Sequence, residues 1–301
     1  MNKNFIGRLI FAGSMAAAGA ANPCSCLAEK QECADKGMKA GRNIPHNGKP
    51  GFVSIIMPAF NCERFIGAAI ESVLAQSYTE WELLVVDDCS SDRTYSIVWK
   101  YSKRDRRIIL FRNKANAGAA ASRNRAVRHA KGQYIAFLDG DDVWKKDKLE
   151  KQVHFMQNTG CLFSCTSYDK IGRSGKGLGR TVHAFCAGYE ELLRKCPGNS
   201  TVMYDAGCLG KYTIPLIKKR NDYVMWLRII KDAGMLYGLD EVLSSHRIVP
   251  GSISYSKAGL VRYHWIVYRH IEKAGIGKSI YLICYWSVRS LFGNAGMKGN
   301  G

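Results

Sequence analysis

Three carboxylates occupy four consecutive positions in Asp139-Gly140-Asp141-Asp142, directly after the apolar run 134–138. Like charges at this density repel unless a cation lies among them, so a divalent cation is the expected partner. The apolar run predicts a buried strand, and strand ends are where α/β proteins bind ligands. The alternative is a solvated acidic turn, and this stretch alone does not decide between the two interpretations.

A second acidic pair, Asp87 and Asp88, follows the apolar run 81–86. A carboxylate at the end of a buried strand can accept hydrogen bonds from a base or a ribose. The alternative is that Asp88 and Asp92 only cap the next helix. We expect Asp92 to cap that helix and Asp88 to bind ligand.

Arg123 lies in the predicted helix 119–130, which follows Gly118. A guanidinium in this position can hold a phosphate through two parallel hydrogen bonds, which a lysine cannot do. The alternative is a solvated helix face, to which we assign Arg125 and Arg128. We expect Arg123 to contact ligand.

The periodicity of apolar residues predicts an α/β fold. Strands alternate with helices in the first half, which implies right-handed crossovers and a mainly parallel sheet. The predicted strands are 52–57, 81–86, 108–111 and 134–138, and the helices between them are 65–74, 92–103 and 119–130. The second half is less regular, with helices 148–157, 189–194, 222–231, 263–273 and 279–292, strands 161–168 and 241–249, and a glycine-rich basic loop at 172–179 that we expect to be mobile.

The composition is that of a globular protein, with 47% hydrophobic and 23% charged residues in 301. The formal net charge of +19 favours anionic partners, either phosphates or an acidic membrane surface. There is no long basic tail and no aromatic-rich RNA-binding motif, so nucleic acid is not the expected partner. The eleven cysteines lack the spacing of zinc sites, which predicts reduced thiols and a cytoplasmic location.

Residues 1–50 resemble a leader. The stretch 5–21 is apolar and rich in small residues, as in a secretory signal peptide, and it is too short to span a membrane. The alternative is that translation begins downstream, for example at Met38. We expect the leader to lie outside the folded domain, and a mature start near Asn22 would contradict the cytoplasmic assignment.

Several motifs occur in an order that resembles glycosyltransferase family two, the inverting enzymes of the GT-A fold. The later tracts are similar to the branch that builds bacterial envelope polysaccharides. The matching segments are 53–61, 85–92, 116–118, 123–124, 138–142, 199–204 and 219–227. The resemblance implies one GT-A domain over 51–256, with a nucleotide-binding half (51–142), an acceptor half (143–256) and a helical tail (257–301).

The family resemblance also implies roles for single residues. Asp88 contacts the base, with Pro58 at the pocket wall and Gly118 nearby. Asp139 faces the ribose, and Asp141 reaches a Mg²⁺ or Mn²⁺ ion that bridges the diphosphate, with Asp139 as a second metal ligand. For the remaining residues, we expect Arg247 to touch the diphosphate, His246 to be structural and Asp142 to cap the following helix.

Asp222 is the predicted catalytic base. Transfer with inversion needs one carboxylate to take the proton of the acceptor hydroxyl. Asp222 begins a predicted helix, whose dipole favours the ionised form. The alternative is a simple helix cap. Many family members carry an acidic residue immediately before this aspartate, but this chain has Asn221, so Asp222 either acts alone or the enzyme is impaired.

The expected function is transfer of a sugar, most simply from a UDP-sugar, to a hydroxyl of a glycan or lipid-linked acceptor in capsule, lipopolysaccharide or similar polysaccharide synthesis. The expected location is the cytoplasm, at the inner face of the membrane. The apolar segment 280–286 is either a core helix or an interfacial anchor. Two alternatives stay open: a nucleotidyltransferase, and a non-catalytic or exported sugar-binding protein.

Overall fold

The computed structural model describes residues 43–44, 46–249 and 260–295. The predicted leader up to residue 42 and the late segment 251–254 lie outside these residues. Residues 43–44 and 46–50 were predicted to belong to the leader, but the structure makes them part of the folded domain. Strand β1 (Asn43–Ile44) pairs with β10 (Lys211–Tyr212), and β2 already begins at Lys49.

Four parallel strands form the first half of the main sheet. Each strand lies within three residues of its predicted bounds, which confirms the predicted alternation. The strands are β2 (Lys49–Ala59), β3 (Trp81–Asp87), β4 (Ile108–Arg112) and β5 (Gly132–Phe137), connected in turn by α2 (Ile66–Leu74), α3 (Thr94–Arg104) and α4 (Ala119–His129).

The second half of the chain adds both parallel and antiparallel strands. Strand β9 (Met203–Asp205) lies antiparallel between β5 and β7 (Phe163–Ile171). Strand β11 (Tyr237–Arg247) continues the sheet parallel to β7, and β6 (Val143–Trp144) closes this edge. The main sheet of the described residues is therefore mixed and mainly parallel, as predicted.

The glycine-rich segment 172–179 is not a plain loop. Its end forms strand β8 (Gly177–Val182), which pairs antiparallel with β7. Gly172 N donates to Lys176 O at 2.8 Å, which closes the turn between the two strands. The prediction of a loop was wrong for residues 177–179. Their backbone N–H and C=O groups belong to a strand that pairs with β7, and the sequence pattern does not reveal this pairing.

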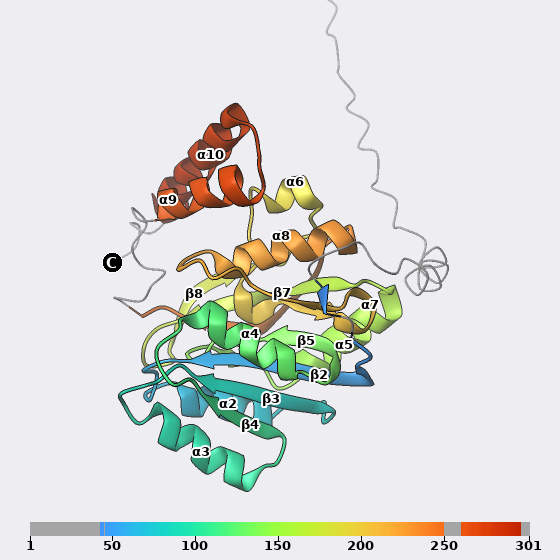
Figure 1. Ribbon diagram of the computed structural model, residues 1–301, viewed down its shortest axis with the longest axis vertical. Helices are drawn as coiled ribbons and strands as arrows, with labels where there is room; N and C mark the ends of the chain where they lie inside the picture. Colours follow the sequence, from blue (N-terminus) through green and yellow to red (C-terminus); the bar gives the residue numbers. More distant parts are fainter. Residues whose placement is uncertain (1–42, 45, 250–259, 296–301) are drawn as a thin grey trace, which may run out of the picture.

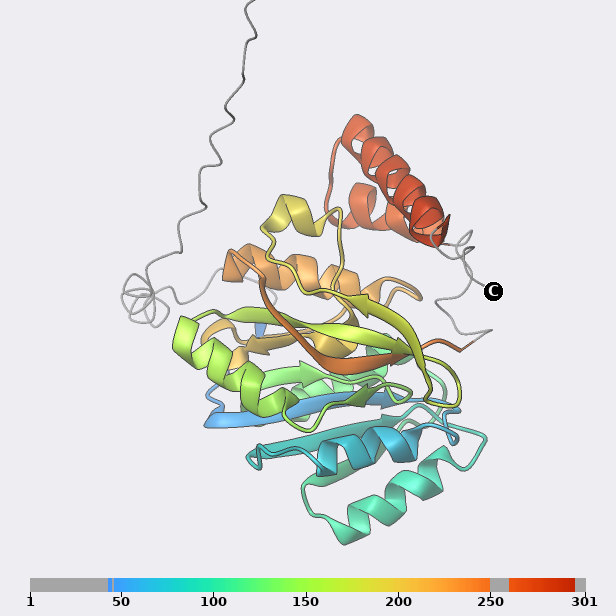
Figure 2. The same ribbon diagram turned by 180° about the vertical axis from the view of Figure 1, so that it is seen from behind.

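Hydrophobic side chains fill both faces of the main sheet. Helices α4 and α8 (Asn221–Ala233) cover one face, whereas α2, α3 and α5 (Lys148–Thr159) cover the other. Figures 1 and 2, seen from opposite sides, show α4 in front of the sheet in the first view and α2 and α5 in the second. All residues of β3 are buried, as expected of a strand that is covered on both faces.

The C-terminal helices pack above α8. They comprise α9 (Leu260–Trp265), the π-helical turn η2 (Ile266–Ile271) and α10 (Ile276–Ala295). Figure 1 shows them at one end of the molecule, beside α8 and α6 (Tyr189–Leu192). Within the described residues, no helix combines the length and apolar character needed to cross a membrane.

An aromatic cluster holds these helices on α8. The ring of His264 lies 4.5 Å from that of Trp286, and its Nδ1 is 3.1 Å from the hydroxyl of Tyr268. Tyr268 in turn packs edge-on against Tyr223 of α8. Burial of His264, with a smaller contribution from the positive charge of Arg220, lowers its pKa to about 3.

The neutral state of His264 predicts a pH-dependent stability. Above pH 6.5 the side chain is neutral in both the folded and the unfolded chain. As the pH falls below 6.5, only the unfolded chain takes up the proton, so the fold loses stability. The free energy of unfolding of the wild type should then fall by up to about 1.4 kcal/mol per pH unit more than that of His264→Gln. Denaturant unfolding across this pH range measures the difference.

His129→Gln is the control, because His129 is exposed on α4. That variant should keep the pH dependence of the wild type. Equal slopes for the wild type and His264→Gln would contradict the assignment of a neutral, buried His264.

Candidate active site

The carboxyl ends of β2, β3 and β5 meet at one edge of the sheet, because these strands are parallel neighbours. The structure thereby brings Pro58, Asp88 and Asp139 to the same edge. Gly140 is favoured by a close approach, because a Cβ atom there would lie 3.1 Å from the Sγ atom of Cys62. The turn 139–142 is thus held tightly against the end of β2.

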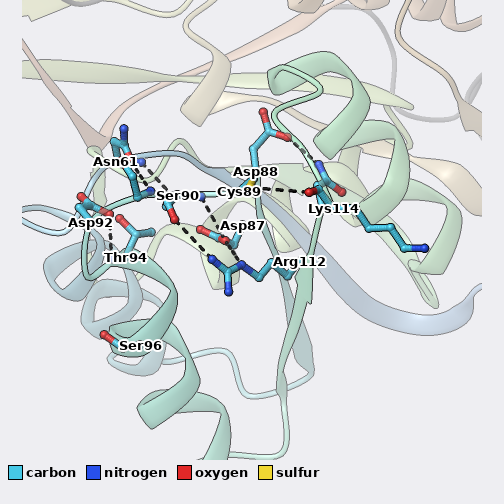
Figure 3. A network of polar contacts seen from close by, with 12 residues as sticks. Asn61, Asp87, Asp88, Cys89, Ser90, Asp92, Thr94, Ser96, Arg112 and Lys114 are labelled. Atoms are coloured by element: carbon cyan, nitrogen blue, oxygen red, sulfur yellow. Dashed lines mark hydrogen bonds and ion pairs between the residues drawn. The ribbon is translucent and has the colours of Figure 1, made fainter.

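Figure 3 shows Asp87 and Asp88 pointing to opposite sides of the chain. Asp87 is fully buried, lies 3.2 Å from the Nε atom of Arg112 and accepts a hydrogen bond from Ser90 N. Asp92 Oδ1 accepts a hydrogen bond from Thr94 N at 2.9 Å, at the start of α3. Asp87 therefore anchors the strand end. Asp92 bonds to the first residue of α3, but the N-cap position of this helix is Arg93, so the prediction that Asp92 caps it was wrong by one residue.

Asp88 holds the loop that leads into α4. Its two oxygens accept hydrogen bonds from Asn113 Nδ2, Ala117 N and Gly118 N at 2.7–2.9 Å. Gly118 has φ 86°, a backbone conformation that glycine adopts without strain. Only one of these bonds uses Oδ2, which leaves that oxygen able to accept another donor.

Cys89 follows Asp88 in a left-handed backbone conformation. Its φ of 61° is one that side chains with a Cβ atom adopt at a cost. The Sγ atom lies 3.8 Å from Lys114 O, and Figure 3 draws this contact.

Asp139 is joined to two other parts of the chain. Its Oδ1 accepts hydrogen bonds from Arg123 Nη2 at 2.7 Å and from Asn199 Nδ2 at 2.9 Å. The same guanidinium donates through Nη1 to Asn221 Oδ1 at 2.9 Å. Burial raises the pKa of Asp139, and Asp142 and Asp222 add to the shift, while Arg123 opposes it. Among the described residues, no side chain donates a hydrogen bond to Oδ2 of Asp139.

Asp141 is the unpaired carboxylate of the cluster. Within the described part of the chain, no other residue donates a hydrogen bond to its side chain. Burial, followed by the negative charges of Asp142 and Asp139, raises its pKa to about 7. A carboxylate in this setting is stabilised by a nearby cation.

Asp142 does not cap the following helix, so that prediction was wrong. It is fully buried, and its carboxylate accepts hydrogen bonds from Ser200 Oγ at 2.6 Å and from Arg247 N at 2.9 Å. His246 Nδ1 lies 3.1 Å from the same carboxylate. Asp142 therefore ties the end of β5 to β11 and to η1 (Asn199–Thr201), partners far away in sequence.

His246 is a cation at neutral pH. Burial alone would lower its pKa, but the attraction of Asp142, with smaller contributions from Asp139 and Asp141, raises it to about 9. The structural role that we expected for His246 agrees with its contact to Asp142. Its positive charge also offsets part of the negative charge at this edge.

The guanidinium of Arg247 makes its contacts with backbone carbonyls. Nε donates to Asp141 O at 2.8 Å, and Nη1 donates to Gly172 O and Arg173 O at 3.0 and 3.1 Å. These bonds place a buried positive charge behind the turn 139–142. The predicted contact between Arg247 and a diphosphate stays a prediction.

Asp222 lies in the first turn of α8, directly after Asn221. Its side chain is partly exposed, and its charge raises the pKa values of Asp139 and of Cys196. Asp222 and Asp139 therefore interact electrostatically although they lie far apart in the sequence. Asn221 uses its side chain to accept from Arg123.

The reasoning from sequence did not assign roles to Asn199 and Ser200. Asn199 holds Asp139, and Ser200 Oγ donates to Asp142 while accepting from Asp139 N at 3.1 Å. The only signal was their place in a tract that matched the family pattern. Nothing local in the sequence indicated which carboxylates they hold.

The comparisons with known proteins agree with this geometry. The chain is 42% identical to Bacillus subtilis TuaG, described as a putative teichuronic acid biosynthesis glycosyltransferase, over 75% of this chain and 90% of that protein. It is 38% identical to Escherichia coli WfgD, a UDP-Glc:alpha-D-GlcNAc-diphosphoundecaprenol beta-1,3-glucosyltransferase, over 77% of this chain and 91% of that one.

A solved structure shares the fold. S. aureus TarS in complex with UDP-GlcNAc superposes with a TM-score of 0.63 at 20% identity, covering 83% of this chain and 76% of that one. This likeness confirms the GT-A fold class. The family model described as Glycosyl transferase family 2 matches residues 54–212. The chain belongs to glycosyl transferase family 2.

Proposed function

We propose that this chain transfers a sugar with inversion from a UDP-sugar to a hydroxyl group of a lipid-linked or glycan acceptor in the synthesis of an envelope polysaccharide. The observation that carries the proposal is the bridge from Asp139 through Arg123 to Asn221, the residue before Asp222. Arg123 bridges Asp139 and Asn221, so the candidate base is fixed beside the candidate nucleotide site.

The two relatives supply the substrate classes. WfgD is named for transfer of glucose from UDP-glucose to a lipid diphosphate, and TuaG for teichuronic acid synthesis. Both match over more than two thirds of their own length. We extend the nucleotide donor and the lipid-linked acceptor to this chain on that basis.

Asp222 acts as the general base in this proposal. The acceptor oxygen forms a bond to the anomeric carbon as the bond from that carbon to the diphosphate oxygen breaks. The acceptor proton passes to Asp222, and the nucleoside diphosphate leaves. Asp222 lies in the first turn of α8 and is partly exposed, so an acceptor hydroxyl can reach it.

Donor recognition is assigned to the edge of the sheet. Oδ2 of Asp88 is free to accept from the base, and Pro58 lines the same edge. Gly118 supports the loop that donates to Asp88, and its φ of 86° suits glycine. Asp139 contributes its open oxygen to the ribose or to a cation, and Arg123 and Arg247 contribute positive charge for the phosphates.

The residues fit a divalent cation. Asp141 has an unpaired carboxylate with a raised pKa, the condition that a cation relieves. Within the described residues, no three His, Cys, Asp or Glu side chains are grouped to hold a metal by themselves. Asp141 and Asp139 would hold Mg²⁺ or Mn²⁺ together with diphosphate oxygens. When bound, the ion neutralises charge on the departing diphosphate.

We further propose that α10 rests on an anionic membrane surface. It carries exposed apolar residues at a spacing of four, with two exposed tyrosines beside them: Ile276, Ile280, Cys284 and Val288, flanked by Tyr281 and Tyr285. Between residues 260 and 288 there are four Lys or Arg residues and one Glu, whose side chain is buried against Lys231. Basic charge beside an apolar stripe matches an anionic bilayer.

Asp222→Asn should lower turnover by about 10²- to 10⁴-fold, because the acceptor hydroxyl loses its base. The affinity for UDP, measured by titration calorimetry, should stay unchanged. Asp232→Asn at the far end of the same helix is the matched control and should keep its turnover. Full transfer activity in Asp222→Asn would contradict the assignment, and no activity in the wild type would favour a non-catalytic protein.

UDP should bind the wild type more tightly with Mn²⁺ than with EDTA. In Asp141→Asn, Mn²⁺ should increase the affinity for UDP much less than in the wild type. In EDTA the variant should bind UDP as tightly as the wild type or more tightly, because a negative charge near the diphosphate is removed. Calorimetric titration of UDP measures both values. Asp147→Asn, an exposed position paired with Lys151, is the control. The metal assignment fails if Mn²⁺ has no effect on the wild type.

The double substitution Ile280→Ser and Val288→Ser should reduce co-sedimentation with vesicles of phosphatidylglycerol, because the apolar stripe is lost. Leu216→Ser removes another exposed apolar side chain and should have no effect. Equal binding of the double variant and the wild type would argue that α10 does not contact lipid.

A further inference from the structure

A cavity that is partly open to solvent lies beside the start of α8. Its volume is about 290 Å³, and it is lined by residues of β7, the end of β8, the segment 193–198, the start of α8 and the C-terminal helices. Arg220 and Tyr223, which flank Asp222 in sequence, both line it. Figure 1 shows α9 and α10 above α8.

The walls of the cavity are cationic and aromatic. Three strongly basic side chains line it, those of Arg194, Lys195 and Arg220, and no Asp or Glu is among the described residues that line it. Its aromatic walls include Tyr223 and Trp286. Aromatic faces pack against the apolar faces of sugar rings, and clustered cations favour phosphate.

Three buried polar atoms of the lining have no hydrogen-bond partner among the described residues. They are Thr166 Oγ1, Arg220 Nε and His264 Nε2. Thr166 and His264 are each only 2% exposed. Buried polar groups are normally paired, so three unpaired atoms in the wall of one cavity are unusual.

Arg220 is held in a strained position. Its backbone has φ 62° and ψ 20°, in the left-handed region that a residue with a Cβ atom adopts at a cost. Its guanidinium lies 5.6 Å from the ring centre of Trp286 and 5.9 Å from that of Tyr223. No carboxylate of the described residues pairs with it, so its charge is available to an anion.

The start of α8 connects this cavity with the sheet edge. Asp222 lies between Arg220 and Tyr223 in sequence, and both of these residues line the cavity. Its neighbour Asn221 is joined through Arg123 to Asp139 at the sheet edge. A molecule bound in the cavity would therefore lie next to the first turn of α8, which carries Asp222.

We propose that this cavity binds the acceptor, a saccharide carrying a phosphate or diphosphate, with Arg220 contacting the phosphate and the aromatic walls contacting the sugar. The inference rests on the proposed function, because it assigns the second substrate of the same site. Five lining residues, Arg220, Tyr223, His264, Tyr268 and Trp286, lie beyond residues 54–212, so they belong to the part of this chain outside the family match.

Binding without turnover tests the cavity directly. The probes are two synthetic ligands with one sugar: an alkyl glycosyl diphosphate and the neutral alkyl glycoside. The wild type should bind the diphosphate more tightly than the glycoside. Arg220→Asn should weaken diphosphate binding by about ten- to a hundredfold, since it removes a charge-assisted hydrogen bond. Asparagine tolerates the left-handed backbone, so the variant should fold.

Further variants test whether the charge of Arg220 itself binds the diphosphate. Arg128→Asn removes an equal charge from an exposed position on α4 and should leave diphosphate binding unchanged. Arg220→Lys keeps the charge and should bind at an intermediate strength. Thermal unfolding checks that each variant is folded. If Arg220→Asn weakens UDP binding as much as it weakens the glycosyl diphosphate, Arg220 serves the donor and the inference is overturned.

The inference is also overturned if a folded Arg220→Asn binds the glycosyl diphosphate as the wild type does. Failure of the proposed function has a different signature: the wild type would show no transfer while cavity binding stayed intact. The two failures are therefore distinguishable in one set of measurements.

Discussion

The guanidinium of Arg123 joins the two halves of the active site. It comes from α4 and donates to Asp139 at the end of β5 and to Asn221 at the start of α8. It is 7% exposed, so a change in either partner would leave a buried charge poorly paired. One buried side chain thereby joins the end of β5 to the start of α8, where Asp222 lies.

This bridge also gives Asn221 a physical role. An acidic residue at this position would compete with Asp139 for the charge of Arg123. Asn221 accepts through a neutral amide oxygen, which keeps the hydrogen bond and leaves the full charge of Arg123 facing Asp139. The departure from the family pattern is thus accommodated without an unpaired group, and it leaves Asp222 as the carboxylate nearest to the start of α8.

The sequence was sufficient for the elements and for the places where strands end. Apolar runs with clear periodicity located β3 and β4 almost to the residue, and strand ends located Asp88 and Asp139. The errors concern long-range pairing. Asp142 precedes a helix and was predicted to cap it. Its partners are Ser200 and His246, which lie far away in sequence and come near only in the folded chain. Strand β8 was missed for the same reason, because its residues form a strand by pairing with β7.

The C-terminal helices have a consequence for how such an enzyme changes over time. They form one wall of the cavity beside the start of α8, and β7 forms part of another wall. They attach through the aromatic cluster around His264 and Tyr268 and through the ion pairs Lys231–Glu272 and Lys278–Glu190. Substitutions in these helices can reshape the cavity while the strands that carry Asp88 and Asp139 stay intact. Under the proposed assignment of the cavity to the acceptor, divergence in what is glycosylated can proceed separately from the choice of activated sugar.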